Sequence, residues 1–407
     1  MTRAQALDAA AQTRARKHER RVYFASHPFV YALSSLAARL APVLSIPRVG
    51  HLVTEPSLAR EVLSSPARFS KTGPGALSDA LTGVMGRSAL VNMDGEGHRQ
   101  LRARLQGLFT PSFVAEAVQQ VFTPPLQALG ERLLRGDSVD LVRVAQGLTG
   151  RIACSMLGLE LPAGKEDETC LELHRAGQEF AAVLTLTRRR LGDARLARAR
   201  ERFDVLTRGA RAAYDSGDER CVPGRLRTLG LDFEESRGVI GLLFLAGTET
   251  TAAALPRLVA LLVDSGQWPT LRQRRECLPM ALDEGLRLTA AVPVMTRNVV
   301  APTRLGGRAM HKDDRVIVLL FKALQSPALL HEPLRFDIER DRTAAAPPLW
   351  FGHGPHFCLG AALARRELEV VLTTLLDLGD LTITRRRHAC AGPLPGYGEL
   401  QVRLTAR

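Results

Sequence analysis

The stretch that decides the fold is Phe351-Gly352-His353-Gly354-Pro355-His356-Phe357-Cys358-Leu359-Gly360, followed directly by the helical pattern Ala361-Ala362-Leu363-Ala364-Arg365-Arg366-Glu367. Cys358 thus lies in a glycine-rich loop just before a predicted helix. The unpaired N–H groups and the positive dipole end at a helix start stabilise a thiolate, which is the form of cysteine that binds metal. Gly352, Gly354 and Gly360 are expected to let a flat cofactor lie against the backbone. An isolated cysteine in such a turn is more often an ordinary buried residue, so the surrounding pattern must decide.

The pattern Phe-x-x-Gly-x-x-x-Cys-x-Gly, matched at Phe351, Gly354, Cys358 and Gly360, resembles the haem-binding signature of the cytochrome P450 family. The resemblance implies that Cys358 is the thiolate ligand of the iron of haem b, where electron donation from sulfur favours O–O bond cleavage. It also implies the fold class: mainly α with a minor β portion, a helix-rich unit packed around haem with small antiparallel sheets. It extends from about Pro47 to the C-terminus.

A second segment, Glu284-Gly285-Leu286-Arg287, falls in the order that the family requires. Glu284 and Arg287 are three residues apart on one face of a predicted helix, which alone is typical of a surface pair. The resemblance implies instead a buried ion pair that organises the structure around the haem-binding loop. Its third partner would be Arg335 or Arg340, and the sequence favours neither.

A third segment, Ala246-Gly247-Thr248-Glu249-Thr250-Thr251, places a carboxylate and hydroxyl groups inside a long apolar stretch. Such groups are costly in a protein core unless they have partners. One interpretation is a kinked helix in which Thr250 bonds back to a carbonyl. The resemblance implies instead a catalytic pair, Glu249 and Thr250, beside the oxygen-binding face of haem. There a locally opened helix would admit water, Thr250 would bond to dioxygen and Glu249 would relay protons.

The resemblance also supplies cations for the haem propionates. His98 and Arg102, four residues apart on one predicted helical face, belong to Gly97-His98-Arg99-Gln100-Leu101-Arg102, and Phe109-Thr110-Pro111 follows. Arg297 and His356 resemble the other propionate partners. The cofactor-binding set implied by the resemblance is therefore His98, Arg102, Arg297, Phe351, Gly354, His356 and Gly360.

Composition excludes some other functions. The formal charge is +13, but only five of the 55 basic residues are lysine in a chain that is 5% aromatic. No nucleic-acid-binding motif accompanies this charge, so we expect no nucleic-acid partner. Six cysteines without Cys-x-x-Cys spacing, and a basic start without an apolar run, indicate a cytoplasmic protein with reduced thiols. The apolar stretch 239–263 contains Glu249, Pro256 and Arg257, which favours a buried core helix over a membrane span.

The sequence has no internal repeat and no low-complexity linker, which favours a single compact unit. The resemblance implies that this unit is one cytochrome P450 domain over residues 1–407, with about residues 1–46 as an N-terminal extension. Helices are expected at 7–21, 101–109, over most of 111–230, and at 234–266, 272–288 and 359–378. Strands are expected at 48–53, 295–300, 303–305, 315–321, 381–384 and 399–404. Residues 69–92 are expected to form a long surface loop and 323–348 an irregular segment. Residues 322–327, Lys-Ala-Leu-Gln-Ser-Pro, depart from the family's Ala-Asn-Arg-Asp-Pro-like stretch.

The function implied by the resemblance is a haem-thiolate monooxygenase that inserts one oxygen atom of O₂ into an apolar organic substrate. The chain has no iron–sulfur spacing and no dinucleotide-binding turn, so electrons would come from a ferredoxin or flavodoxin served by an NAD(P)H-dependent reductase. We expect a monomer. Two alternatives are a peroxide-driven or isomerising haem-thiolate enzyme and a non-catalytic haem protein that binds a gas. The substrate-facing segments implied by the resemblance are 69–92, 180–186, 242–246, 292–296 and 394–395.

Overall fold

The computed structural model describes residues 3–73, 77–183, 192–340, 349–390, 392 and 394–405. Helices dominate these residues, which confirms the expected fold class. In chain order the helices are α1 (Arg3–Ser26), α2 (Pro28–Leu40), α3 (Pro56–Ser64), α4 (Leu77–Met85), α5 (Gly95–Leu105), α6 (Pro111–Leu134), α7 (Leu141–Met156), α8 (Glu166–Val183), α9 (Asp193–Thr207), α10 (Ala210–Ser216), α11 (Val222–Thr228), α12 (Phe233–Asp264), α13 (Trp268–Gln273), α14 (Leu278–Thr289), α15 (Leu320–Ala323) and α16 (Ala361–Leu378).

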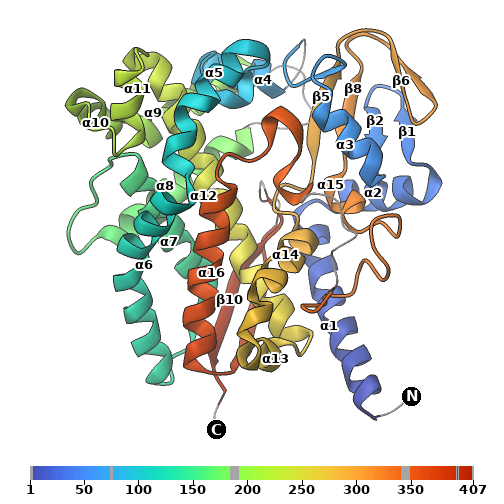
Figure 1. Ribbon diagram of the computed structural model, residues 1–407, viewed down its shortest axis with the longest axis vertical. Helices are drawn as coiled ribbons and strands as arrows, with labels where there is room; N and C mark the ends of the chain where they lie inside the picture. The colour runs from blue at the N-terminus through green and yellow to red at the C-terminus, as the bar shows by residue number, and fades with distance from the viewer. Residues whose placement is uncertain are drawn as a thin grey trace.

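The strands form three small sheets. They are β1 (Val43–Ile46), β2 (Gly50–Val53), β3 (Phe69–Ser70), β4 (Val139–Asp140), β5 (Met295–Val299), β6 (Thr303–Leu305), β7 (Arg308–Met310), β8 (Arg315–Val318), β9 (Leu381–His388) and β10 (Tyr397–Leu404). The largest sheet has the order β1-β2-β8-β5-β3, and β4-β10-β9 and β6-β7 form the others. Most pairs are antiparallel, as expected, but β2 and β8 are parallel, with His51 opposite Val316. Figure 1 shows the largest sheet at one side of the molecule and most of the helices at the other.

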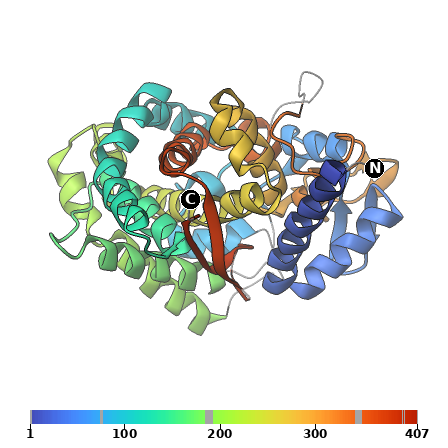
Figure 2. The same cartoon turned by 90° about the horizontal axis from the view of Figure 1, so that it is seen from below.

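Helix α12 runs through the centre of the molecule (Figures 1 and 2). It begins at a capping box in which Asp232 accepts from the Glu235 N–H and the Glu235 carboxylate accepts from the Asp232 N–H. It is long and apolar enough to cross a membrane by composition alone, but most of its apolar stretch is buried by the surrounding helices. This agrees with the prediction of a core helix. Gly285 of α14 lies so close to α12 that a Cβ there would be 2.0 Å from a Leu258 methyl carbon.

The N-terminal extension is helical and packs on the core. Figure 2 shows α1 and α2 lying together at one edge of the molecule. Glu19 of α1 forms a buried ion pair with Arg257 of α12, and the Tyr23 hydroxyl donates to the carbonyl of Thr289 at 2.7 Å. Because Arg257 is fully buried, α1 supplies the carboxylate that this core guanidinium requires.

Several segments differ from their sequence-based expectations. The strand expected at 315–321 ends at Val318, and α15 begins at Leu320. Two longer segments also differ. Residues 69–92 contain β3, α4 and a 3₁₀ turn at Leu90–Asn92, where a continuous loop was expected. The helix expected at 272–288 is divided, because α13 ends at Gln273 and α14 begins only at Leu278 after a 3₁₀ turn at Arg275–Cys277. In both places short apolar helices are stabilised by burial of side chains such as Leu81 and Leu271.

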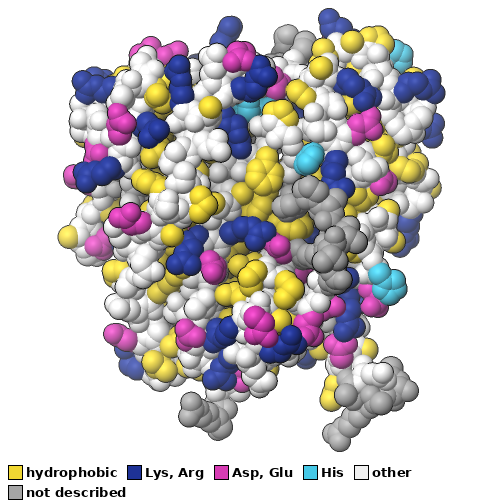
Figure 3. All heavy atoms as spheres, viewed as in Figure 1, with side chains coloured by type: hydrophobic (Ala, Val, Ile, Leu, Met, Phe, Trp, Pro, Cys, Tyr) yellow, Lys and Arg dark blue, Asp and Glu magenta, His cyan; other side chains and the backbone are white. Residues whose placement is uncertain are grey.

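The basic charge is dispersed on the visible surface. Figure 3 shows Lys and Arg side chains interspersed with Asp and Glu over the face of Figure 1, with no single basic patch. Many arginines of the described chain pair with carboxylates, among them Arg151 with Asp167 at 2.9 Å and Arg211 with Asp215 at 2.8 Å. This arrangement is typical of a solvated surface and offers no continuous track for a phosphate backbone on that face.

Candidate active site

The glycine-rich loop holds Cys358 at the base of a cavity of about 460 Å³ between α12 and α16. The Cys358 N–H donates to the Phe351 carbonyl at 2.9 Å, which closes the loop into a hairpin. The Phe351 and Phe357 rings meet edge to face, with centroids 6.1 Å apart. Cys358, Phe351 and Gly360 all line the cavity, so the loop presents the cysteine to its interior.

The glycines of this loop have different roles. Gly354 does not line the cavity. Its φ is +70°, and a Cβ there would lie 2.5 Å from the Leu63 carbonyl oxygen, so it lets the loop pack on the end of α3. A Cβ on Gly352 would meet Met295 and the His356 carbonyl, whereas Gly360 faces open space. Of the three glycines that were expected to let a flat cofactor lie against the backbone, only Gly360 lines the cavity.

Basic side chains from separate elements converge on one side of the cavity. His98 and Arg102 come from α5, Arg297 from β5 and His356 from the loop, and all four line the cavity. Their expected contact with the haem propionates stays a prediction. The His98 and His356 ring centroids are 4.2 Å apart. Sequence reasoning missed Lys71, which follows β3 and also lines the cavity. Nothing in the local sequence around Lys71 signals this role.

Asp94 positions His356 from behind the cavity. Its Oδ1 lies 2.7 Å from His356 Nε2, and its Oδ2 accepts from the Ser70 hydroxyl at 2.6 Å and the Lys71 N–H at 2.7 Å. Burial opposes ionisation of Asp94, but these hydrogen bonds prevail and hold its pKa below the usual value. Sequence reasoning also missed this residue, because Asp94 and His356 are far apart in the chain.

The cavity fits an anionic planar cofactor. Among the described lining residues five basic groups face a single carboxylate, that of Glu367. Burial, and then the neighbouring His356 and Arg102, lower the pKa of His98 to about 4, and burial and Arg297 lower that of Lys71 to about 7. Carboxylates beside these groups would relieve their mutual repulsion. The two propionates of haem supply such carboxylates, and its ring fits the apolar remainder of the cavity.

The three polar residues at the middle of α12 point in different directions. Thr250 and Thr251 line the cavity, but Glu249 does not. Glu249 is buried against α8, where its Oε1 lies 3.3 Å from His174 Nδ1. Burial raises the pKa of Glu249 to about 8, which a hydrogen bond from Gln178 partly offsets. The expected pair thus has one member in the cavity and one behind it.

Helix α12 is continuous through this region, so the expected local opening is not observed. The Thr250 hydroxyl donates to the Ala246 carbonyl at 2.9 Å, and Thr248 makes the same bond to Phe244. Side chains that bond back one turn in this way leave the helix intact. This is the back-bonding that the sequence offered as the alternative interpretation, although the Thr250 side chain still faces the cavity.

The pKa of Cys358 depends on burial as well as on the position of the residue before a helix. Burial raises the pKa of Cys358 above its usual value, while a Gly360 N–H and Arg102 lower it. The Gly360 N–H and Arg102 thus favour the thiolate, as expected at a helix start, whereas burial opposes it. Metal binding displaces the proton from such a thiol.

Glu367 of α16 is a further buried acid that lines the cavity. No role was predicted for it from the sequence. It is 2% exposed and lines the cavity beside Thr251. Burial raises its pKa to about 8, and Thr251 opposes this shift. Its position nine residues after Cys358, on the inner face of the following helix, is the only sequence signal that could have identified it.

The ion pair expected at Glu284 and Arg287 is buried, with two contacts of 2.7 and 2.8 Å. Arg340 is the third partner, because its Nε lies 3.2 Å from the Glu284 carboxylate. Arg335 pairs instead with Asp8 at 2.9 Å. The structure thus resolves the choice that the sequence left open.

The expected substrate-facing segments contribute unequally to the cavity. Lining residues come from 69–92, 242–246 and 292–296: Leu81, Leu90, Val91, Leu242, Leu243, Ala246, Val292, Val294, Met295 and Thr296. Phe180 packs instead against Phe203, and the Pro395 carbonyl accepts from Arg257 at 3.1 Å. Residues 74–76 and 184–186 lie outside the described residues. The described lining is mainly apolar, as predicted for an apolar ligand.

A cysteine loop before α16, a polar turn of α12 facing it and a convergent set of cations define a haem-thiolate class of protein. Comparison with known proteins gives the same result. A family model described as Cytochrome P450 matches residues 269–385. The erythromycin C-12 hydroxylase of Saccharopolyspora erythraea is 30% identical over 340 residues, covering 80% of this chain and 81% of that protein. The chain belongs to the cytochrome P450 family.

Other relatives differ in coverage. The putative cytochrome P450 140 of Mycobacterium tuberculosis is 40% identical over 148 residues, which are 36% of this chain and only a third (33%) of that protein. The structure of a mutant of P450 EryK in complex with erythromycin B has a TM-score of 0.76 at 26% identity, covering 94% of this chain and 98% of that chain. The likeness to solved structures thus extends over almost the whole fold.

Proposed function

We propose that this protein is a monooxygenase that inserts one oxygen atom of O₂ into an apolar organic substrate, by hydroxylation or epoxidation. The observation that carries the proposal is the placement of Cys358 in an apolar cavity that the Thr250 hydroxyl also faces. Similar proteins named as monooxygenases or hydroxylases, such as the erythromycin C-12 hydroxylase, support it. A haem b would supply oxygen activation when bound.

Different residues of this chain would then bind the iron, hold the propionates and orient the substrate. Cys358 Sγ would ligate the iron, and the Gly360 N–H that bonds to this sulfur would moderate its electron donation. Arg102, Arg297, His98 and His356 would hold the propionates. Apolar side chains of α12 and of 292–295 would orient the substrate and exclude water.

Proton delivery would fall to Thr250 and Glu249. The Thr250 hydroxyl donates to Ala246, so its oxygen can accept a hydrogen bond from the cavity side. Glu249, with a pKa of about 8, holds a proton at neutral pH behind the cavity wall, next to His174 of α8. We propose that this carboxyl group stores the proton and that Thr250 places it at the reacting oxygen.

Electrons would come from an external ferredoxin or flavodoxin with an NAD(P)H-dependent reductase, and we propose that the protein acts in the cytoplasm as a monomer. Measurement of product formation distinguishes the candidate functions. Product formed with O₂, NAD(P)H and surrogate redox partners supports the monooxygenase. Product formed only with added peroxide supports the peroxide-driven enzyme, and gas binding without turnover of any compound in a panel supports the gas-binding protein.

The ligand assignment is tested by the ferrous carbonyl spectrum of Cys358→Ser. A thiolate-ligated ferrous carbonyl absorbs at unusually long wavelength, and we expect this band to disappear in the variant. The matched control is Cys390→Ser, since Cys390 is an exposed free cysteine that does not line the cavity. Retention of the band in Cys358→Ser would show that another residue ligates the iron.

A further inference from the structure

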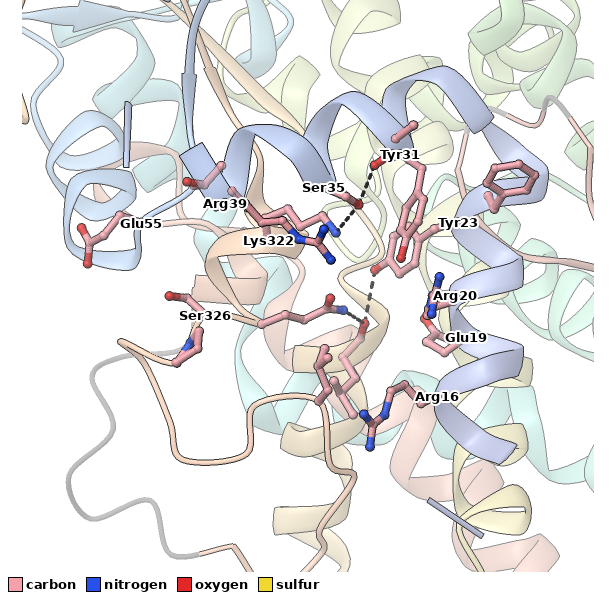
Figure 4. Close-up of a pocket in the computed structure, with 18 of the residues that line it drawn as sticks. Arg16, Glu19, Arg20, Tyr23, Tyr31, Ser35, Arg39, Glu55, Lys322 and Ser326 are labelled. Carbon is pink, nitrogen blue, oxygen red and sulfur yellow. Dashed lines mark hydrogen bonds between the residues drawn. The ribbon is translucent and has the colours of Figure 1, made fainter. Parts of the chain in front are cut away.

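A second cavity, of about 790 Å³, lies between α1, α2 and the segment that follows β8 (Figure 4). Among the described residues, it shares no lining residue with the cavity of Cys358. Four residues of the atypical stretch 322–327 line it: Lys322, Gln325, Ser326 and Pro327. The stretch that departs from the family pattern therefore forms one wall of this cavity. The proposed function assigns the cavity no role.

Lys322 is a half-buried cation in an aromatic setting. Its Nζ donates to the Ser35 hydroxyl at 2.9 Å and lies 4.6 Å from the Tyr31 ring centroid and 4.9 Å from that of Phe321. In the described part of the chain no carboxylate pairs with it. Burial, with Arg20 and Arg39 nearby, lowers its pKa to about 8. An ammonium group in such a position would be stabilised by an anion.

Three arginines surround the same space. Figure 4 shows Arg39 and Lys322 on one side of the cavity and Arg16 and Arg20, both from α1, on the other. All three guanidinium groups belong to exposed residues, and no described carboxylate forms an ion pair with any of them. Their hydrogen-bond donors are therefore available to a ligand in the cavity.

Among the described residues, two acids line the cavity, and both already have partners. Glu19 forms its ion pair with Arg257, which lies in the core. Glu55 caps α3, where it accepts from the Leu58 N–H at 2.9 Å and from the Ser57 hydroxyl at 2.5 Å. Arg257 balances the charge of Glu19, and the single charge of Glu55 does not balance the four cations, so the cavity has a net positive field.

We propose that this cavity binds an organic phosphate, whose phosphate group lies among Lys322, Arg39 and Arg20 and whose remaining part lies against Tyr23 and Tyr31. A phosphate carries up to two charges and three acceptor oxygens, which suits several convergent donors better than one carboxylate does. The aromatic wall is rigid, because the Tyr23 ring stacks on Phe321 at 4.9 Å and its hydroxyl is anchored to α14.

The phosphate could belong to a free metabolite or to a lipid headgroup. The second source has support from α2, where Phe29, Leu33, Leu36 and Leu40 form one line along the helix and are 88%, 41%, 54% and 62% exposed. An apolar helix face beside basic groups is the combination that binds anionic membrane surfaces. The shared chemistry is a phosphate ester, and the experiment must separate the sources.

The test uses the full-length, haem-loaded protein. Isothermal titration calorimetry with glycerol 3-phosphate reports the free source, and co-sedimentation with phosphatidylcholine vesicles, with or without phosphatidylglycerol, reports the lipid source. We expect binding in at least one arm, weakened by added salt, and a loss of about tenfold or more in affinity in Lys322→Met, equivalent to about 1.4 kcal/mol. The matched control is Lys312→Met, an exposed lysine in the β7–β8 turn, with unchanged binding.

Two further variants test the site independently of Lys322→Met and separate the two sources of phosphate. Arg39→Gln removes an exposed charge, so it tests the site even if Lys322→Met fails to fold or to load haem. Leu36→Ser should weaken vesicle binding and leave glycerol 3-phosphate binding unchanged, which would identify the lipid source. The proposal is overturned if neither ligand binds, or if Lys322→Met and Arg39→Gln both bind as the parent protein does.

Discussion

Three adjacent side chains of α12 show how one helical turn can face both the cavity and the core behind it. Thr250 faces the cavity, Glu249 is buried against α8, and Thr251 lies beside Glu367 of α16. Successive helical residues point about 100° apart, and at this turn Thr250 and Thr251 line the cavity whereas Glu249 does not. The motif therefore joins the cavity to a buried acid behind its wall.

Removal of the Thr250 hydroxyl should separate electron consumption from product formation. In Thr250→Ala we expect haem content and substrate affinity close to those of the parent, with a severalfold loss of product per NAD(P)H and a corresponding gain in peroxide or water. The measurement is product, peroxide and NAD(P)H with surrogate redox partners. Thr248→Ala is the matched control, since Thr248 makes the same back-bond but does not line the cavity. Equal coupling in the two variants would remove Thr250 from the proposed proton path.

Glu367 should make stability depend on pH. Its pKa is about 8 in the folded protein, so between about pH 4.5 and 8 the unfolded chain ionises while the folded chain stays neutral. The free energy of unfolding should therefore fall as pH rises through this window, by up to about 1.4 kcal/mol per pH unit. Glu367→Gln should flatten the dependence, because the amide does not ionise.

The measurement is the thermal midpoint of the haem-loaded protein from pH 5 to 8. Glu249 has a similar pKa, so Glu367→Gln should remove only part of the slope. Glu369→Gln, an exposed change on the same helix, should leave the slope unchanged. A Glu367→Gln slope equal to that of the parent would show that the carboxylate is solvated in the folded protein.

At the scale of elements, the buried cluster of Glu284, Arg287 and Arg340 joins α14 to the segment before the cysteine loop. Arg287 also donates to the carbonyls of Leu324 and Pro333, at 2.8 and 2.7 Å. A single side chain thus fixes the irregular segment that follows α15. The sequence predicts the pair but not these carbonyl partners, which only the folded chain brings within reach.

Glu284→Ala should destabilise the protein by about 3–5 kcal/mol, because it leaves two buried guanidinium groups without their carboxylate. That loss is comparable to the whole stability of many domains, so we expect low haem content or insoluble protein. Arg335→Ala is the control, since its pair with Asp8 is partly exposed and contributes about 1 kcal/mol or less. Haem content and thermal midpoint are the readouts, and a fully loaded, stable Glu284→Ala protein would refute the structural role.

The positions of helices and strands were predictable where apolar periodicity is long, as for α12 and α16. They were not predictable for α4 or for the break between α13 and α14, because short helices depend on tertiary burial more than on local propensity. The same limit applies to the site. Cys358, Arg102 and Arg297 follow motifs, whereas Asp94 and Lys71 acquire their places only when β3, α5 and the cysteine loop pack together.

At the scale of the whole molecule, the proposed function requires an external electron donor, and α5 runs from the cavity to the protein surface. Arg102 lines the cavity, while Arg104 on the same helix is exposed. Other exposed or half-exposed arginines near the site pair with acids: Arg99 with Glu96, Arg365 with Asp283 and Arg366 with Glu369. No described carboxylate forms an ion pair with Arg104, so it is the best placed of the four to meet an acidic electron donor.

Arg104→Glu should slow the first electron transfer from a ferredoxin severalfold at low ionic strength and flatten its salt dependence. Surface charges act mainly on the encounter between partners and are screened over about 8 Å at physiological salt. Substrate affinity should not change, since Arg104 does not line the cavity. The measurement is stopped-flow reduction under carbon monoxide over a range of salt concentrations.

Arg403→Glu provides the same charge reversal at the other end of the molecule, on β10 near the C-terminus (Figure 1). If long-range net charge alone governs association, the two variants should slow reduction equally. If the partner docks beside α5, only Arg104→Glu should do so, because its charge lies within the screening length of the contact. Equal rates and salt slopes in Arg104→Glu and the parent would place the docking surface elsewhere.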